Sequence, residues 1–396
     1  MAVALAAASA VFALTGPATA SLKTQLDRAL AAPGISSSNT GAIVFDLSGS
    51  SFVYSRNTGL PLKPASNEKL PVSVTALMDL GPTFKIPTDV LGEGALQPNG
   101  VWQGRLVLKG YGDPALTSLK LRRLARAVVD AGIRRVTGAI VGDETYFDKV
   151  RVGPGWKPSF YKEECPPLSA LIVDRGHVGR AISSSPALAA ALKFKKKLQA
   201  LGVAVPGRAK LGKADPGAVQ IGRVRSPYVS TLVQRLNRQS DNFYAEMLLK
   251  KLGAERRGSG TTAAGIQVVR NELRDRGVTM TGLVLADGSG LSSYDRLTAR
   301  AVAELLISAF SDSTIGTAFV SSLPLAGVNG TLKDRMTRPP AYRNVRAKTG
   351  TTDVASALSG YVRTRYVFAI LMNGSPIPWW NARTAQDRFA QVLAAQ

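Results

Sequence analysis

Ser66 and Lys69 are spaced in a way that could support nucleophilic catalysis. Lys69 follows Ser66 by three residues, and Leu70, Val74 and Leu77 continue at helical spacing. An i, i+3 pair lies on one face of a helix, so the lysine amine could take the serine's proton. A lysine does this only when burial or a neighbouring cation lowers its pKa. The motif alone is weak, because a serine that precedes a helix is also an ordinary N-cap.

A second candidate motif is the tripeptide Ser240-Asp241-Asn242. It separates two helices that we expect at roughly 227–238 and 243–253. A serine and an asparagine that point the same way from a loop can relay a proton and hold a substrate amide. S-x-N recurs elsewhere in this chain, and helix capping is the alternative interpretation.

A third motif, Lys348-Thr349-Gly350, is followed by Thr351 and preceded by strand-like residues. A strand edge with a lysine, a hydroxyl and a glycine could bind a carboxylate. The lysine supplies charge, the threonine a donor, and the glycine close backbone approach. An extended peptide could also pair along such an edge. The alternative is a basic edge strand that resists aggregation.

The amino-acid composition excludes several kinds of functional site. His177 and Cys165 are the only residues of their types, so an intrachain disulfide and a cysteine-based zinc cluster are excluded. We therefore expect no metal and no cofactor, and catalysis without a histidine base. The formal net charge of +23 predicts attraction to polyanions such as nucleic acid, anionic lipid or anionic wall polymers.

Residues 1–20 resemble a cleaved export signal. They are uncharged, rich in Ala and Val, and end in Ala18-Thr19-Ala20, an A-x-A pattern. The basic start of such a signal is missing, so a disordered N-terminus or a short anchor is the alternative. We expect an exported protein in the periplasm or the extracellular cell-wall space. There the positive charge would meet anionic wall polymers or a membrane surface.

Helices and strands are expected close to both ends of the chain. Apolar spacing predicts terminal helices, and two hairpins lie just inside them. The expected helices cover 22–30 and 385–393, and the hairpin strands cover 42–47, 51–55, 357–363 and 366–372. This arrangement suggests that the chain ends share one sheet and that the middle of the chain is an insertion.

Taken together and in this order, the three motifs match the signature S-x-x-K, S-D-N and K-T-G of penicillin-binding proteins and class A β-lactamases. The sequence resembles the class C low-molecular-mass penicillin-binding proteins, the D-alanyl-D-alanine carboxypeptidase/endopeptidase type. The matching pieces are PASNEK (64–69), LKGYGDPAL (108–116), IVGDETYFD (140–148), PPLSALIVDRG (166–176), RQSDNFYAE (238–246), ADGSGLS (286–292), LPLAGVNGTL (323–332) and AKTGTT (347–352).

The resemblance implies an α+β fold, a β-lactamase/transpeptidase-like antiparallel sheet flanked by helices, with an inserted second domain. The expected catalytic domain is discontinuous and comprises residues 21–90 and 223–396. The insertion is expected over 91–222, because the stretch between the first two motifs is long. A third domain, present in larger relatives, is expected to be absent or vestigial.

The resemblance also implies residue roles. Ser66 would be the acylated nucleophile and Lys69 its base, with Ser240 and Asn242 in the middle of the site. Lys348, Thr349, Gly350 and Thr351 would bind the substrate's terminal carboxylate and carbonyl. Backbone N–H groups of Ser66 and Thr351 would form the oxyanion hole. The implied substrates are peptidoglycan stem peptides, and the implied inhibitors are β-lactams.

Two further residues, Asp143 and Phe147, match positions that hold the diaminopimelate side chain in relatives. An arginine that completes that set in relatives is replaced here by Ser293, and Arg296 lies three residues further on. A missing guanidinium predicts weak preference for a free side-chain carboxylate.

Three alternatives remain at this stage. A class A β-lactamase shares the motifs, but its first two motifs are closer together, and Glu163-Glu164-Cys165-Pro166 does not fit its E-x-x-L-N motif. A catalytically idle, basic wall-binding protein could use the same fold. A nucleic-acid binder would explain the charge but neither the export signal nor the motifs, so no nucleic-acid partner is expected.

Overall fold

The computed structural model describes residues 20–396, and its two ends pair in one five-stranded antiparallel sheet. This confirms the expected sheet shared by the chain ends and the expected α+β class. The strand order is β11-β12-β13-β1-β2. The bounds are β1 (Thr40–Asp46), β2 (Ser51–Arg56), β11 (Val345–Thr351), β12 (Ala355–Val362) and β13 (Tyr366–Asn373). The expected export signal lies outside the described residues except for Ala20.

Both faces of this sheet are covered by helices, as β13 illustrates. Its Val367, Ala369 and Leu371 belong to one apolar core, whereas Phe368 and Ile370 belong to another. Successive side chains of a strand point to opposite faces, so a strand covered on both faces reads as a continuous apolar run. The first face packs on α9 (Ala299–Ser311), and the second packs on α11 (Trp379–Ala394), which contacts α1 (Leu22–Leu30).

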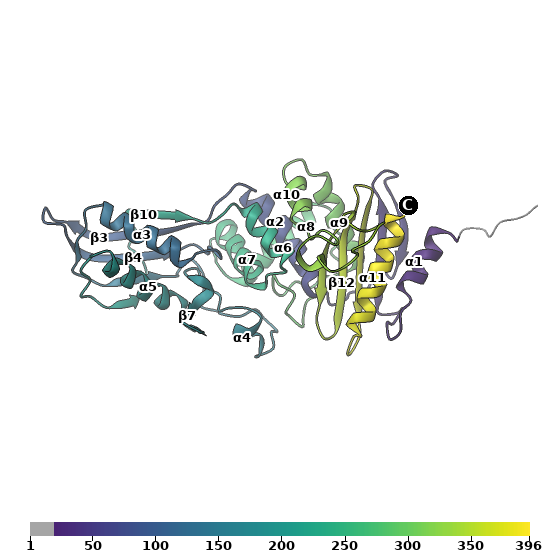
Figure 1. The fold of residues 1–396 in the computed structure, drawn as a ribbon, viewed down its shortest axis with the longest axis horizontal. Helices are drawn as coiled ribbons and strands as arrows, with labels where there is room; N and C mark the ends of the chain where they lie inside the picture. Colours follow the sequence, from purple (N-terminus) through teal and green to yellow (C-terminus); the bar gives the residue numbers. More distant parts are fainter. Residues whose placement is uncertain (1–19) are drawn as a thin grey trace, which may run out of the picture.

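A group of helices lies between this sheet and the inserted segment (Figure 1). They pack mainly on one another and enclose the start of α2, where the first motif lies. Their bounds are α2 (Lys69–Leu80), α6 (Val229–Arg238), α7 (Asn242–Arg257), α8 (Thr262–Asp275) and α10 (Gly316–Ser322), with 3-10 turns η1 (Ala65–Glu68) and η3 (Gly330–Leu332).

The inserted segment forms a second sheet at the opposite end of the molecule (Figure 1). Its order is β10-β3-β4-β6-β9, with β5 paired to β4. The strands are β3 (Pro87–Leu96), β4 (Val101–Gly110), β5 (Arg135–Val136), β6 (Ile140–Asp143), β9 (Ala209–Leu211) and β10 (Val219–Arg225), with helices α3 (Ser118–Asp130) and α5 (Pro186–Ala200). The sheet therefore begins before residue 91 and ends after residue 222, a few residues beyond the expected boundaries.

The stretch between β6 and α5 runs back toward the helices at the centre. It contains short elements only: α4 (Phe160–Glu163), η2 (Asp174–Gly176), β7 (His177–Val178) and β8 (Ala181–Ile182). Across residues 20–396, none of the helices is both long and apolar enough to cross a lipid bilayer.

Two expected helix boundaries were wrong. The C-terminal helix begins at Trp379 and not at Ala385, and the helix after the second motif ends later than expected. The sequence pattern placed the end of the helix after the second motif at Gly253, but α7 continues to Arg257 and ends at Gly258, which has a left-handed φ of 64°. A Cβ on Gly253 would lie 2.7 Å from the backbone nitrogen of Gly265 on α8. Gly253 therefore allows two helices to approach closely and does not terminate one.

Candidate active site

The three sequence motifs meet at the edge strand β11. A Cβ on Gly350 would lie 2.8 Å from the Pro64 carbonyl oxygen and 3.1 Å from the Ser66 backbone nitrogen, so this strand passes directly beside the serine. Asn67 Nδ2 also donates to the carbonyl oxygen of Lys348 at 3.2 Å. Only a glycine allows this close approach of backbones.

Ser66 does not begin an α-helix but lies in the 3-10 turn η1, with α2 starting at Lys69. Ala65, immediately before it, has a φ of 47°, which is unfavourable for a residue with a Cβ. The turn is held from behind by Gly290, where a Cβ would lie only 1.9 Å from the Ala65 carbonyl oxygen. Packing thus supports a strained turn that presents the serine.

Lys69 Nζ lies 2.9 Å from Ser66 Oγ and has no solvent exposure. It also donates to Asn242 Oδ1 at 2.7 Å and to the Ser289 carbonyl oxygen at 2.5 Å. Burial lowers the pKa of Lys69 to about 8, although the charge of Asp287 acts in the opposite direction. A buried amine with this pKa can be neutral at a modest energetic cost, which a general base requires.

The second motif connects α6 to α7 in a tight turn. Ser240 has a left-handed φ of 54°, and Asp241 caps α7 by accepting the Tyr244 backbone N–H at 3.3 Å. The Asp241 carboxylate is also bound by Arg175 at 2.7 Å and by Arg235 at 3.2 Å. This fixed turn directs its two polar side chains to different partners, Ser240 to Lys348 and Asn242 to Lys69.

The third motif provides a second buried amine. Lys348 Nζ donates to Ser240 Oγ at 2.8 Å and to the Thr349 carbonyl oxygen at 2.7 Å. Burial and the nearby charge of Lys69 lower the pKa of Lys348 well below its usual value. Thr349 Oγ1 lies 2.7 Å from Thr331 Oγ1, and the exposed Thr351 accepts a hydrogen bond from Arg383 at 3.2 Å.

Two cavities open on either side of Thr351. One, of about 580 Å³, is lined by Ser66, Ser240 and Thr349. The other, of about 510 Å³, lies beside Ala65. Arg383 and Thr351 border both. We refer to these two adjoining cavities together as the groove; it borders the serine and the edge of β11, with which an extended chain can pair.

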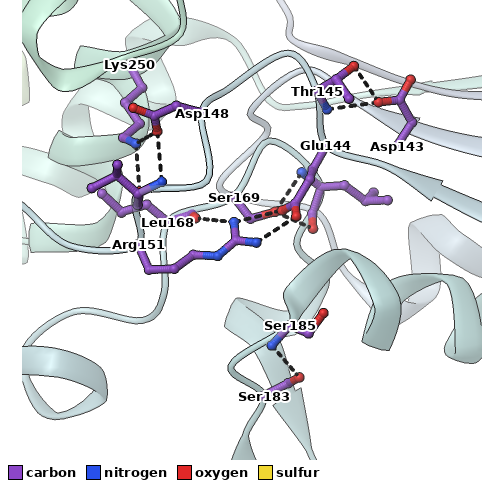
Figure 2. A network of polar contacts seen from close by, with 12 residues as sticks. Asp143, Glu144, Thr145, Asp148, Arg151, Leu168, Ser169, Ser183, Ser185 and Lys250 are labelled. Atoms are coloured by element: carbon purple, nitrogen blue, oxygen red, sulfur yellow. Dashed lines mark hydrogen bonds and ion pairs between the residues drawn. The ribbon is translucent and has the colours of Figure 1, made fainter. Parts of the chain in front are cut away.

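The structure does not bring Asp143 and Phe147 to this groove, contrary to the expectation from the resemblance. Asp143 is fully buried and accepts from the backbone N–H and hydroxyl of Thr145 (Figure 2) and from the backbone N–H of Ala214. Phe147 packs where Gly112 and Gly260 leave room. Both residues stabilise the loop after β6.

Ser293, which replaces the arginine of relatives, does line the 510 Å³ cavity. The Arg296 guanidinium does not take the place of that arginine, because it donates to the nearby backbone carbonyl oxygens of Ser293 and Asp295.

Four buried carboxyl groups beneath Lys69 were missed by sequence reasoning. They belong to Glu68, Glu246, Asp287 and Asp295. Burial and mutual repulsion raise the pKa of Glu68, that of Glu246 to about 8 and that of Asp295 to about 12. No local pattern marks these residues, because they come from three separate segments and resemble ordinary surface acids in the sequence.

The comparisons with known proteins agree with this geometry. The model of the D-Ala-D-Ala carboxypeptidase 3 (S13) family matches residues 22–185 and 178–396, and the chain belongs to this family. It is 31% identical to the D-alanyl-D-alanine carboxypeptidase of an Actinomadura species, over 98% of this chain and 87% of that protein. It is also 31% identical to carboxypeptidase DacB of Mycolicibacterium smegmatis, over 95% of this chain and 84% of that protein.

Solved structures show the same fold. Penicillin-binding protein 4 of Haemophilus influenzae superposes with a TM-score of 0.82 at 22% identity, covering 93% of this chain and 98% of that one. A β-lactam complex of the same protein superposes with a TM-score of 0.75 at 20% identity, with the same coverage.

The buried acids predict a pH dependence of folding stability. The raised pKa of Asp295 means that the folded state keeps a proton that the unfolded state releases above about pH 4. Stability is then lost as pH rises, by up to about 1.4 kcal/mol per pH unit for one group. In Asp295→Asn the free energy of unfolding, measured in denaturant from pH 5 to 8, should fall less steeply than in the wild type. Asp130→Asn, an exposed control, should keep the wild-type slope; an unchanged slope in Asp295→Asn would contradict a protonated Asp295.

Proposed function

We propose that this protein is a serine D-alanyl-D-alanine carboxypeptidase that acts on peptidoglycan stem peptides through an acyl-enzyme on Ser66. The observation that carries the proposal is the contact of Ser66 Oγ with the fully buried Lys69 amine, at 2.9 Å. An amine whose pKa is about 8 is a usable base near neutral pH, whereas an exposed lysine is not.

The reaction begins when neutral Lys69 takes the Ser66 hydroxyl proton and Ser66 Oγ attacks the carbonyl of the terminal D-Ala-D-Ala bond. The backbone N–H groups of Ser66 and Thr351 stabilise the oxyanion, since β11 passes next to the serine. The proton that Lys69 took then passes to the nitrogen of the departing D-alanine, with Ser240 Oγ as the relay, so the C–N bond breaks, free D-alanine leaves and Lys69 is neutral again. Water then hydrolyses the Ser66 ester, with Lys69 again accepting a proton.

The substrate's terminal carboxylate would bind at the Lys348 side of the groove. Thr349 Oγ1 and Ser240 Oγ supply hydroxyl donors at the 580 Å³ cavity. Burial lowers the pKa of Lys348, but a bound carboxylate raises it again, so Lys348 supplies positive charge from behind the hydroxyls when the substrate is present. The cavity is larger than one D-alanine needs, which supports cleavage of cross-links as an additional endopeptidase activity. In that reaction the leaving group is the side-chain amine of a second stem peptide.

β-Lactams would acylate Ser66 and act as inhibitors, because they offer a reactive carbonyl beside a carboxylate, as the substrate does. The same proposal places the protein outside the cytoplasm, in the periplasm or the cell-wall space, where stem peptides occur. Its net charge of +23 supports association with anionic wall polymers or with a membrane surface there.

The first test is covalent labelling. Benzylpenicillin should add one equivalent to the wild-type protein, measured as intact mass, because the activated serine forms an ester with the opened ring. Ser66→Ala should show no adduct, since it lacks the nucleophile. Ser37→Ala, an exposed serine of another S-x-N tripeptide outside the three motifs, should label like the wild type. A stoichiometric adduct on Ser66→Ala would contradict the assignment of Ser66 as the nucleophile.

A second test separates the two buried lysines. Lys69→Arg should lose at least about a thousandfold in kcat on a peptide ending in D-Ala-D-Ala, because arginine cannot act as a base at neutral pH and general base catalysis supplies factors of this order. Lys348→Arg should keep measurable turnover, because its role is to carry charge. Equal tolerance of the two changes, with both variants folded by circular dichroism, would contradict these roles.

A further inference from the structure

One loop of the inserted segment reaches the catalytic centre, and its two ends are held together at their base. We refer to residues 152–167 as the bridging loop. Arg151, just before it, makes a two-pronged ion pair with Glu144 and donates to the carbonyl oxygen of Leu168, just after it (Figure 2). The Leu168 backbone N–H returns a bond to the Arg151 carbonyl oxygen at 3.1 Å. The loop therefore leaves the inserted domain from one fixed point.

The far part of the bridging loop contacts the catalytic body at several points. The Gly155 carbonyl oxygen accepts from the backbone N–H and the hydroxyl of Ser293, each at 3.3 Å. Trp156 Nε1 donates to Asp287 Oδ2 at 2.7 Å, and the Glu164 carbonyl oxygen accepts from Asn242 Nδ2 at 3.1 Å. Lys157 pairs with Asp353 at 2.8 Å, but both side chains are largely exposed. Exposed ion pairs contribute little, so the contacts of Gly155, Trp156 and Glu164 hold the loop in place.

The Trp156 contact leads directly to Lys69. Asp287 is buried, and besides the indole N–H it accepts the backbone N–H groups of Ser289 at 3.0 Å, Gly290 at 2.7 Å and Ser292 at 2.8 Å. These bonds fold the turn that presents the Ser289 carbonyl oxygen to Lys69 Nζ. The indole thus stabilises the carboxylate that shapes one wall of the lysine's site.

The Glu164 contact controls the direction of the Asn242 amide. The backbone carbonyl oxygen of Glu164 can only accept a hydrogen bond. The Asn242 nitrogen must therefore face the loop, and the Asn242 oxygen must face Lys69. The amide nitrogen has a second hydrogen, which remains available for a substrate carbonyl. The loop also carries Cys165, which is fully buried, and Phe160, which lines the 510 Å³ cavity.

We propose that the bridging loop is a positioning element of the acylation centre, and that Trp156 is the positioning residue through which it acts on Lys69. This inference rests on the proposed acyl-enzyme function. The inserted domain is then part of the catalytic centre and not only a wall of the substrate groove. Gly153 supports this role, since a Cβ there would lie 2.4 Å from Trp156 Nε1 and would displace the indole.

Detachment of the loop would change the surroundings of Lys69, which include several titratable groups. Those that face it are Asp241, Glu246, Cys165, Asp287, Glu68 and Lys348. Burial is the largest influence and lowers the pKa of Lys69. Water admitted beside Lys69 by a loosened loop would raise that pKa, and the acid limb of the acylation profile would move to higher pH.

The test is Trp156→Phe, which keeps an aromatic ring and removes the indole N–H. The second-order rate of benzylpenicillin acylation, measured by intact mass from pH 5.5 to 9, should fall at least fivefold at pH 7, with its acid limb shifted upward. The matched control is Trp102→Phe, a buried tryptophan of the inserted sheet, which should keep the wild-type rate and limb. A merely structural role would lower the melting temperature and leave the pH profile unchanged.

Asp287→Asn weakens the same contact from the other side, because it removes the carboxylate charge that accepts the indole N–H and turns one of the two terminal atoms into a donor. Trp156→Phe should slow acylation less than 1.5-fold further in that background, since the two changes remove one interaction. Wild-type-like acylation and an unchanged limb in Trp156→Phe, or full additivity with Asp287→Asn, would overturn the inference alone. Failure of the wild-type protein to be acylated would instead overturn the proposed function.

Discussion

The burial of one lysine amine is the constraint on which the rest of this structure depends. Lys69 has no solvent exposure, and the free energy of removing an ammonium from water is what lowers its pKa. The cost of that burial is offset by three hydrogen bonds, to Ser66, Asn242 and Ser289, each from a different part of the chain. A base of this kind exists only when all three segments are in place.

The carboxyl groups beneath Lys69 affect the equilibrium between its neutral and its protonated form. If all four were ionised, they would stabilise the ammonium form and remove the base. Burial and mutual repulsion raise the pKa of Glu68, Glu246 and Asp295, so these groups hold protons more readily than ordinary acids do. Asp287 keeps its place by accepting backbone N–H groups and the Trp156 indole. The site thus combines a poorly hydrated amine with acids that carry limited negative charge.

Much of this arrangement could be predicted from sequence, because motifs and periodicity report local constraints. The i, i+3 spacing of Ser66 and Lys69 and the hairpins near both chain ends led to the observed contact and to the observed shared sheet. Contacts that depend on packing between distant segments were not predictable. Gly253 resembled a helix end, although its role is to let α8 approach, and Asp143 matched a binding position, although it is buried in its own loop.

The partners of the second motif illustrate the same limit. Asp241 in the sequence is an ordinary helix cap, and only the fold shows Arg175 from the inserted segment on its carboxylate. Trp156 gives no local signal either, because its partner Asp287 lies far along the chain. The inserted segment therefore contributes to the centre through long-range polar contacts, which sequence periodicity does not encode.

The central claim is that neutral Lys69 activates Ser66, and the pH dependence of acylation tests it most directly. The lowered pKa of Lys69, about 8, predicts that the second-order rate of benzylpenicillin acylation rises with pH, about tenfold per unit well below pH 8, and levels off above it. Protonated Lys69 cannot accept the serine proton, so the rate must fall as pH decreases. A rate that stays constant from pH 6 to 9 while the protein remains folded would contradict the account.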